Sequence, residues 1–298
     1  MLSTPKILVC TDFSLCSKLA LKAGERLRVL SKGELEVLHV LDYPTALDWV
    51  SDAIFSPGLS RKTSEEEIKK KTERVLQEQM NSCEVHGSAI VLQGSPITEI
   101  EREIVEKKID LVVIGHVGKS RSPFHLGNVA EKVVATSKVP VLIVKSDLKS
   151  TRIGALVPPK APMNKIISWA EEFSYLLSTD LVVVSLFKDP FPQITQENRA
   201  EHKPDVVDFI QQHRQESMET TELLIRKELN RFVGARLIVQ GNDDLRVAGK
   251  LRSILEAEGV ELAVMQRHHS QLLERIIIGS ETKRMLEFFP GNLLILPP

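Results

Sequence analysis

The stretch Val112–Ser120, VVIGHVGKS, places two glycines, a histidine and a lysine directly after an apolar run. Its last three letters also close the P-loop of nucleoside triphosphatases, in which backbone amides of the whole turn wrap the phosphates. A P-loop requires a glycine five residues before Gly118, and that position holds Val113. The stretch is therefore not a P-loop, and its glycines must serve a different kind of turn.

The elements around this stretch have the alternation of a parallel sheet covered by helices. Helix start signals lie between the apolar runs: Ser14 can cap one helix, Ser64–Glu67 has capping-box spacing, and Ser95–Pro96 puts proline in a first turn. The first half of the chain thus predicts an α/β fold, a doubly wound domain of five strands and four helices. The predicted strands are residues 6–11, 35–41, 89–93, 111–114 and 141–144.

The second half of the chain repeats this order. LEVLHVLDYP, at Leu35–Pro44, matches LVVVSLFKDP, at Leu181–Pro190, with an offset of 146 residues. Residues 260–296 likewise repeat residues 111–144 as a strand, a polar loop, a helix from Ser280 and a final strand. We therefore expect a tandem duplication, with a first domain at residues 1–147 and a second at residues 148–298.

The final strand of each half is apolar and would form an exposed sheet edge. These strands are Val141–Val144 and Leu293–Leu296. Since edge strands need cover, we expect the two halves to pack about a pseudo-two-fold axis as an intramolecular pseudo-dimer. Whether two such chains associate further as a homodimer is left open by the sequence.

Composition excludes several classes of protein. The net charge of −1 over 298 residues gives no cationic face for nucleic acid, and no apolar run reaches the roughly 18 to 20 residues that span a membrane. No signal-peptide pattern precedes the first strand, so we expect a soluble, cytoplasmic protein. The three cysteines lack metal-ligand spacing, and His268–His269 has no carboxylate or cysteine partner at ligand spacing, so no metal is expected.

Several motifs, in order, resemble the universal stress protein family in its tandem form. They are KILVCTDFS at Lys6–Ser14, LHV at Leu38–Val40, GSPITEI at Gly94–Ile100, the run Val112–Val134, and VPVLIV at Val139–Val144. The resemblance implies five-stranded parallel sheets in the order 3-2-1-4-5, with the fifth strands paired antiparallel between the repeats. It also implies ATP or AMP at the carboxyl ends of the central strands, where ligands bind open α/β sheets.

The nucleotide signature of the family is G-x-x-G, nine residues, then G-[ST]. Gly115 and Gly118 match the first pair, but only eight residues, with Pro123 among them, separate Gly118 from Gly127. Asn128 replaces the hydroxyl residue, and we expect it to cap the helix and to hydrogen-bond a phosphate. The binding residues implied by the resemblance are Asp12 and Val40 on the adenosine side, Ile114, Gly115, Gly118, Lys119, Gly127, Asn128 and Val129, with Arg121 as a further nearby cation.

The second repeat departs from this signature in the opposite way. Gly279–Ser280 are kept, but Gln266 and His269 occupy the two glycine positions and Pro158 stands where the first repeat has Asp12. A side chain in the phosphate path clashes where glycine would allow close approach. We therefore expect the first repeat to be the better nucleotide site, with weak discrimination between ATP and AMP.

Five of these residues also have a purely structural interpretation. Asp12 can cap the turn into the next helix, Gly115 and Gly118 can be ordinary turn glycines, and Lys119 and Arg121 can be solvated loop charges. Three functions follow. The first is a nucleotide-responsive regulator of the stress response. The alternatives are a degenerate pseudo-dimer that has lost nucleotide and binds an unidentified protein partner, and a weak ATPase.

No catalytic residue can be named from spacing, so the sequence predicts binding over catalysis. Two long connections, Tyr43–Thr63 and Lys188–Pro204, follow equivalent strands. Both are expected to lie near the carboxyl ends of the strands. The first of them includes a predicted short helix at Ala46–Phe55.

Overall fold

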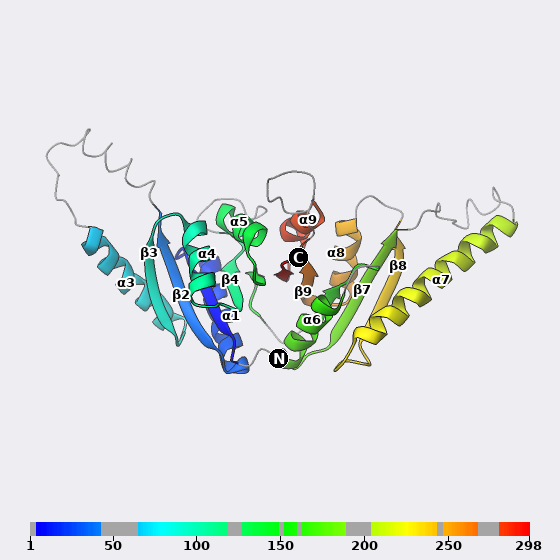
Figure 1. Ribbon diagram of the computed structural model, residues 1–298, viewed down its shortest axis with the longest axis horizontal. Helices are drawn as coiled ribbons and strands as arrows, with labels where there is room; N and C mark the ends of the chain where they lie inside the picture. Colours follow the sequence, from blue (N-terminus) through cyan, green and yellow to red (C-terminus); the bar gives the residue numbers. More distant parts are fainter. Residues whose placement is uncertain are drawn as a thin grey trace, which may run out of the picture. The chain divides into compact units, whose positions relative to one another are not determined.

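The computed structural model describes residues 4–42, 65–117, 127–148, 152–159, 163–188, 204–242, 247–267 and 280–298. These residues form two compact units, one at residues up to Leu148 and one beginning with the strand at Arg152. Each unit is a parallel sheet with helices packed on it (Figure 1). The α/β fold class expected from the sequence is confirmed.

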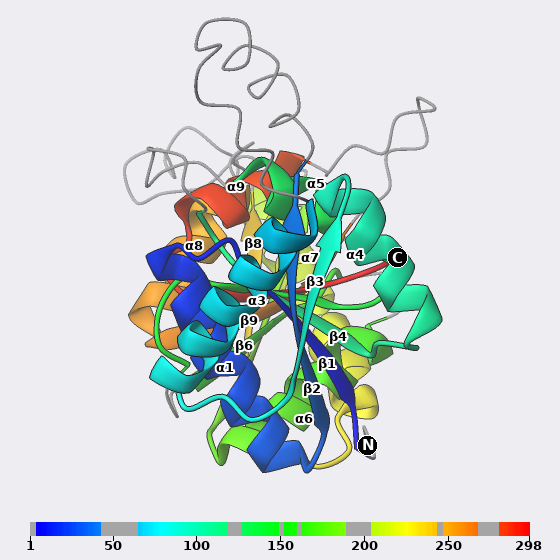
Figure 2. The same cartoon turned by 90° about the vertical axis from the view of Figure 1, so that its left-hand side faces the viewer.

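The five strands of the first unit, β1 to β5 in chain order, lie side by side in the order 3-2-1-4-5. The central strand β1 thus pairs with β2 on one side and with β4 on the other. All these pairings are parallel. Figure 2 shows α1 and α3 on one side of this sheet and α4 on the other. The elements are β1 Lys6–Cys10, α1 Leu15–Ser31, β2 Glu34–Leu41, α3 Glu65–Ser82, β3 Ser88–Gln93, α4 Pro96–Glu106, β4 Leu111–Gly115, α5 Asn128–Thr136 and β5 Val141–Val144.

The second unit has the same topology. β6 lies between β7 and β9, β8 lies beyond β7, and β10 lies beyond β9, again in parallel pairings. Its elements are β6 Arg152–Leu156, α6 Asn164–Leu177, β7 Leu181–Lys188, α7 Pro204–Glu228, β8 Arg236–Asn242, α8 Val247–Ala257, β9 Val260–Gln266, α9 Ser280–Phe288 and β10 Asn292–Leu296.

The sequence explains these elements locally. The central strands are almost continuously apolar because helices cover both faces of a parallel sheet, and Leu8, Val9 and Val183 are fully buried. Ser14 caps α1, since its hydroxyl oxygen accepts a hydrogen bond of 3.2 Å from the Ser17 N–H. Ser95 precedes α4 and Pro96 occupies its first turn. Both predicted helix starts are confirmed, whereas Ser64 lies outside the described residues.

The units agree in the details of their helix endings. After α1, Lys32 adopts the left-handed conformation, with a φ of 55°, and the Gly33 N–H donates to the Arg28 carbonyl over 2.9 Å. After α6, Ser178 does the same, with a φ of 53°, and the Thr179 N–H donates to the Ser174 carbonyl over 2.9 Å. Corresponding residues are 146 positions apart, the offset found in the sequence.

Other expectations need correction or fall outside the described residues. β1 ends at Cys10, so Thr11 lies beyond it, and β4 extends to include Gly115. The connection Tyr43–Thr63, with its predicted helix, lies outside the described residues, as does the connection between β7 and α7, except that Lys188 ends β7 and Pro204 begins α7. The pairing of the two fifth strands stays a prediction. Among the helices that the structure describes, none has both the length and the hydropathy of a membrane span.

Candidate functional site

Several residues predicted for the site lie at the carboxyl edge of the first sheet. Cys10 of β1 pairs with Leu38 of β2 and with Ile114 of β4. Asp12 lies two residues beyond Cys10, and Val40 lies two residues beyond Leu38, so both extend past the same level of the sheet. Gly115, the last residue of β4, pairs with Val144 of β5. The parallel strands therefore carry these residues to one edge.

The start of α5 is attached to this edge. The His116 N–H donates to the Val144 carbonyl over 3.0 Å, and the Gly127 N–H donates to the His116 carbonyl over 2.9 Å. The first N–H groups of a helix have no partner within the helix and form its positive end. The chain thus brings a helix N-terminus beside the end of β4. Gly118 and Lys119 lie outside the described residues.

The expectation that Asn128 caps α5 is wrong. Gly127 holds the capping position, with φ −60° and ψ 142°, so the capping residue supplies no side-chain hydrogen bond to the first turn. Asn128 is the first helical residue and its side chain is exposed, while Val129 is half-buried. The bond from Gly127 to His116 fixes this register. Any phosphate recognition by the cap would therefore come from backbone N–H groups.

Gly115 has a clear packing role. A Cβ atom at this position would lie 2.8 Å from the carbonyl carbon of Cys16 and 3.0 Å from the Ser17 nitrogen, both in the first turn of α1. Backbone atoms cannot move aside as a flexible side chain can, so only glycine allows α1 to approach β4 this closely. The same close approach keeps α1 and the turn before it against the carboxyl edge.

Asp12 also has a structural role, the one that the sequence left as its alternative interpretation. One carboxylate oxygen, Oδ1, accepts a hydrogen bond of 3.0 Å from the Ser14 N–H, and the Thr11 hydroxyl oxygen accepts one of 3.1 Å from the Phe13 N–H. These local bonds close the turn between β1 and α1. They hold the Asp12 carboxylate in one position at the edge of the sheet.

Sequence reasoning missed the pair of Phe13 and His39. Phe13 has a φ of 65°, a left-handed conformation that is an outlier for a bulky residue, and its ring centroid lies 4.3 Å from that of His39. His39 Nδ1 lies 2.8 Å from the Thr11 carbonyl oxygen. Since a carbonyl can only accept, the ring carries a proton on Nδ1. The motif letters TDFS and LHV contain both residues, but no sequence signal indicates the backbone conformation of Phe13.

Electrostatics distinguish two further groups near this edge. Burial lowers the pKa of Lys145, which follows β5 directly, to about 8. Burial raises the pKa of the Cys10 thiol to about 12, so this cysteine is a packed side chain and not a nucleophile. The described residues contain no cluster of three or more His, Cys, Asp or Glu side chains placed to hold a metal ion.

The corresponding edge of the second unit carries different side chains. β9 ends at Gln266 and is followed by Arg267, which is 5% exposed and whose pKa is lowered by burial. The Arg267 N–H donates to the Leu296 carbonyl over 2.9 Å, as His116 does to Val144 in the first unit. Pro158 follows β6 and Ser280 begins α9. His269 and Gly279 lie outside the described residues.

Comparison with known proteins identifies the family. Residues 4–145 match the model of the universal stress protein family. The chain is 31% identical over 153 residues to universal stress protein MJ0577 of Methanocaldococcus jannaschii, a match that covers 47% of this chain and 94% of that protein. It is also 31% identical over 145 residues to universal stress protein YxiE of Bacillus subtilis, covering 47% of this chain and 98% of that protein. The chain therefore belongs to the universal stress protein family.

Solved structures extend the likeness in fold to the whole chain. A protein of unknown function from Pseudomonas aeruginosa, PA1789, is similar with a TM-score of 0.66 at 16% identity, and the match covers 99% of this chain and 93% of that one. A universal stress protein from Archaeoglobus fulgidus is similar with a TM-score of 0.64 at 16% identity, covering 98% of each chain. At this identity the likeness concerns the fold alone.

Proposed function

We propose that the chain is a stress-response regulatory protein whose first unit binds an adenine nucleotide, ATP or AMP. The observation that carries the proposal is the meeting, at one edge of the first sheet, of the Asp12 turn with the N-terminus of α5, which the Gly127–His116 hydrogen bond ties to β4. Membership of the family supports a nucleotide as the ligand, since some members bind ATP or AMP there.

In this proposal the residues divide between the two ends of the nucleotide. Asp12 and Val40 contact the adenosine part, and the Ile114–Gly115 backbone lies beneath it. The first N–H groups of α5, at Asn128 and Val129, attract the phosphates through hydrogen bonds and the helix dipole. Gly118 and Lys119 belong to the site by the family signature. Protein partners respond to the nucleotide-bound state of the chain.

Calorimetric titration with ATP and with AMP tests the proposal, using two variants of Asp12. Asp12→Asn keeps an oxygen that can accept from the Ser14 N–H, and so keeps the turn, but it removes the charge. Asp12→Ala removes both. We expect both variants to weaken nucleotide binding at least tenfold, with only Asp12→Ala lowering the melting temperature of the ligand-free protein. Binding that Asp12→Asn leaves unchanged would exclude Asp12 as a nucleotide ligand.

The second candidate is the non-binding, protein-interaction form of the pseudo-dimer. It is favoured by a specific observation: Gly115 and Asp12 each have a structural role that requires no ligand. Calorimetric titration of the wild-type chain separates the two candidates. If the chain is a non-binding interaction module, neither ATP nor AMP should give a heat of binding. Release of phosphate from ATP by the wild-type chain would instead identify a weak ATPase.

A further inference from the structure

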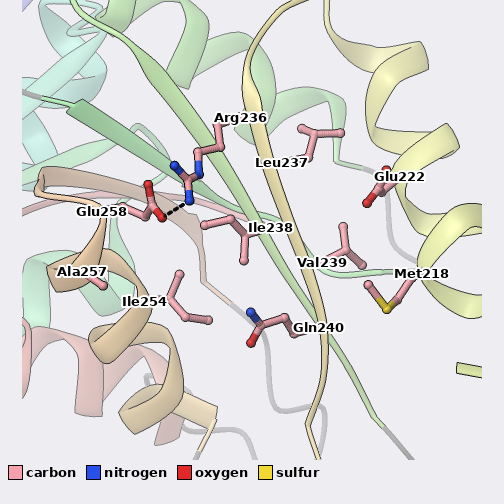
Figure 3. Close-up of a pocket in the computed structure, with 10 residues that line it drawn as sticks. All are labelled: Met218, Glu222, Arg236, Leu237, Ile238, Val239, Gln240, Ile254, Ala257 and Glu258. Carbon is pink, nitrogen blue, oxygen red and sulfur yellow. Dashed lines mark ion pairs between the residues drawn. The ribbon is translucent and has the colours of Figure 1, made fainter. Parts of the chain in front are cut away.

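A cavity of about 450 Å³ runs along β8, the edge strand of the second unit (Figure 3). One wall is formed by α7 and the other by α8, so that the edge of the strand lies between two helices. We call this cavity the β8 groove. Its lining residues are Met218, Glu222, Arg236, Leu237, Ile238, Val239, Gln240, Ile254, Ala257 and Glu258.

The floor of the β8 groove is a strand edge that is suited to further pairing. Among the described residues β8 pairs only with β7, in an unbroken register from Arg236 to Asn242. In a parallel pair, alternate residues of an edge strand direct their N–H and C=O groups away from the sheet. β8 contains no proline and no bulge, two of the devices that protect sheet edges. Its backbone therefore has the hydrogen-bonding pattern that recognises another extended chain.

The side chains of the groove offer apolar contacts on both faces of the strand. Leu237 and Val239 point toward α7, from which Met218 projects (Figure 3). Ile238 points to the other side, where Ile254 and Ala257 of α8 form the wall. Leu237 and Ile238 are only half-buried, so the groove retains apolar surface that a bound chain would cover.

The charges of the groove indicate one polar feature of its ligand. Arg236 pairs with Glu258 over 2.8 Å, and Arg152 pairs with the same carboxylate group over 3.4 Å. Glu222, half-buried on the α7 wall, forms no ion pair with any residue in the described part of the chain. Arg152 also pairs with Asp180 over 3.9 Å, so the two arginines are balanced by Glu258 and Asp180. The charge of Glu222 therefore leaves the groove net negative, and a basic side chain at that level would complement it.

We propose that the β8 groove binds an extended peptide segment of a partner protein, which adds a strand to the sheet beside β8. The segment carries apolar side chains toward both walls and one lysine or arginine opposite Glu222. Main-chain hydrogen bonds supply the affinity in this mode of recognition, and alternate side chains supply the selectivity. A second copy of β8 is a poorer occupant, because it would bring its own flanking helices against α7 and α8.

The test uses a defined probe, a peptide of threonine, valine, valine, lysine, valine, valine and threonine with both termini blocked. Two further versions are N-methylated, one at the odd and one at the even interior positions. A bound strand pairs along one edge only, so one N-methylated version should bind like the parent and the other should lose at least tenfold in affinity. Equal binding by both versions, or no saturable binding of the parent, would overturn the proposal.

Variants of the full chain locate the bound peptide. Ile254→Asp should weaken binding at least tenfold, whereas Leu223→Asp, at an α7 residue that is 56% exposed and outside the groove lining, should leave it unchanged. Glu222→Lys should reject the parent peptide but bind a version with glutamate in place of lysine, which a misfolded variant could not do. If β8 amides instead become protected from hydrogen exchange as the concentration of chain alone rises, the occupant is a second copy and the proposal is wrong.

Discussion

Glu25 of α1 receives hydrogen bonds from two other residues. Arg28 donates to both carboxylate oxygens, over 2.9 and 2.8 Å, and the backbone N–H of His86 donates over 3.1 Å. The His86 ring nitrogen Nδ1 lies 3.0 Å from the same group. Burial alone would raise the pKa of Glu25, but these hydrogen bonds lower it to about 2. The carboxylate thus links α1 to the segment that precedes β3.

This link should be visible in the pH dependence of stability. Because the pKa of Glu25 lies below its ordinary value of 4.5 in the folded protein, its contribution is complete above pH 4.5 and is lost as the pH falls toward 2. Glu25→Gln should cost about 2 kcal/mol in urea unfolding at pH 7, after allowance for solvent screening. It should also flatten the pH profile between these limits. Glu66→Gln, which breaks an exposed pair with Lys70, is the control and should cost under about 0.5 kcal/mol.

Glu103 of α4 should have the opposite pH dependence. It is 3% exposed, and burial together with the neighbouring Glu36 carboxylate raises its pKa above the ordinary 4.5. The folded protein therefore holds this proton to a higher pH than the unfolded chain does, and stability falls as the pH rises from 4.5 through the raised pKa. Glu103→Gln should abolish that fall and raise the free energy of unfolding at pH 7 by about 1 kcal/mol. A variant less stable than wild type at pH 7 would contradict this account.

At the scale of residues, the sequence indicates which residues lie at the site but not the hydrogen bonds and contacts that they form. The motifs that contain Asp12 and Gly115 predict that both lie there. The turn bond of Asp12 and the contact of Gly115 with Cys16 depend on how α1 packs against β4, which spacing does not reveal. The left-handed conformation of Phe13 could not be predicted, because the backbone energy of a bulky residue favours other conformations. In the structure Phe13 has both a local bond to Thr11 and a ring contact with His39.

The matching ends of α1 and α6 allow a paired test at the scale of elements. Lys32 and Ser178 are both exposed and both adopt the left-handed conformation that glycine adopts without strain. Lys32→Gly and Ser178→Gly should each raise the free energy of unfolding by about 0.5–1 kcal/mol, because relief of strain exceeds the added freedom of the unfolded chain. Chemical denaturation of the whole chain measures both.

Lys22→Gly is the matched control for this pair of variants. Lys22 is an exposed interior residue of α1, where glycine should destabilise by about 1 kcal/mol. A destabilising effect of glycine at all three positions would show that left-handed strain at Lys32 and Ser178 is negligible.

Elements were more predictable than their ends. Strands buried on both faces form apolar runs that stand out in the sequence, so the predicted strands of the first unit agree with β1 to β5 within one residue at either end. The start of α5 was misplaced by one residue, because it is set by the bond from Gly127 to His116 and not by the capping preference of Asn128. Tertiary bonds of this kind have no local signature.

At the scale of the whole chain, the proposed function predicts that the two units respond unequally to nucleotide. ATP should slow hydrogen exchange in β1, β4 and α5 while leaving β6, β9 and α9 unchanged, because ligand stabilises only the unit that binds it. Gly118→Val should abolish this protection, since a side chain then stands in the phosphate path, and Ser280→Ala should preserve it. Protection centred on α9, or lost in Ser280→Ala, would move the site to the second unit.

In each unit, a backbone hydrogen bond joins the residue after the fourth strand to the last residue of the fifth strand. This bond bears on which substitutions the chain tolerates there. His116 and Arg267 are both buried but differ in the size and shape of their side chains, yet each donates its N–H to the carbonyl that ends the fifth strand. Every substitution except proline retains that donor. Such a substitution at either position therefore changes the side chain while it keeps the backbone bond to the end of the fifth strand. The two units therefore share one connection of the fourth and fifth strands although they carry different side chains at it.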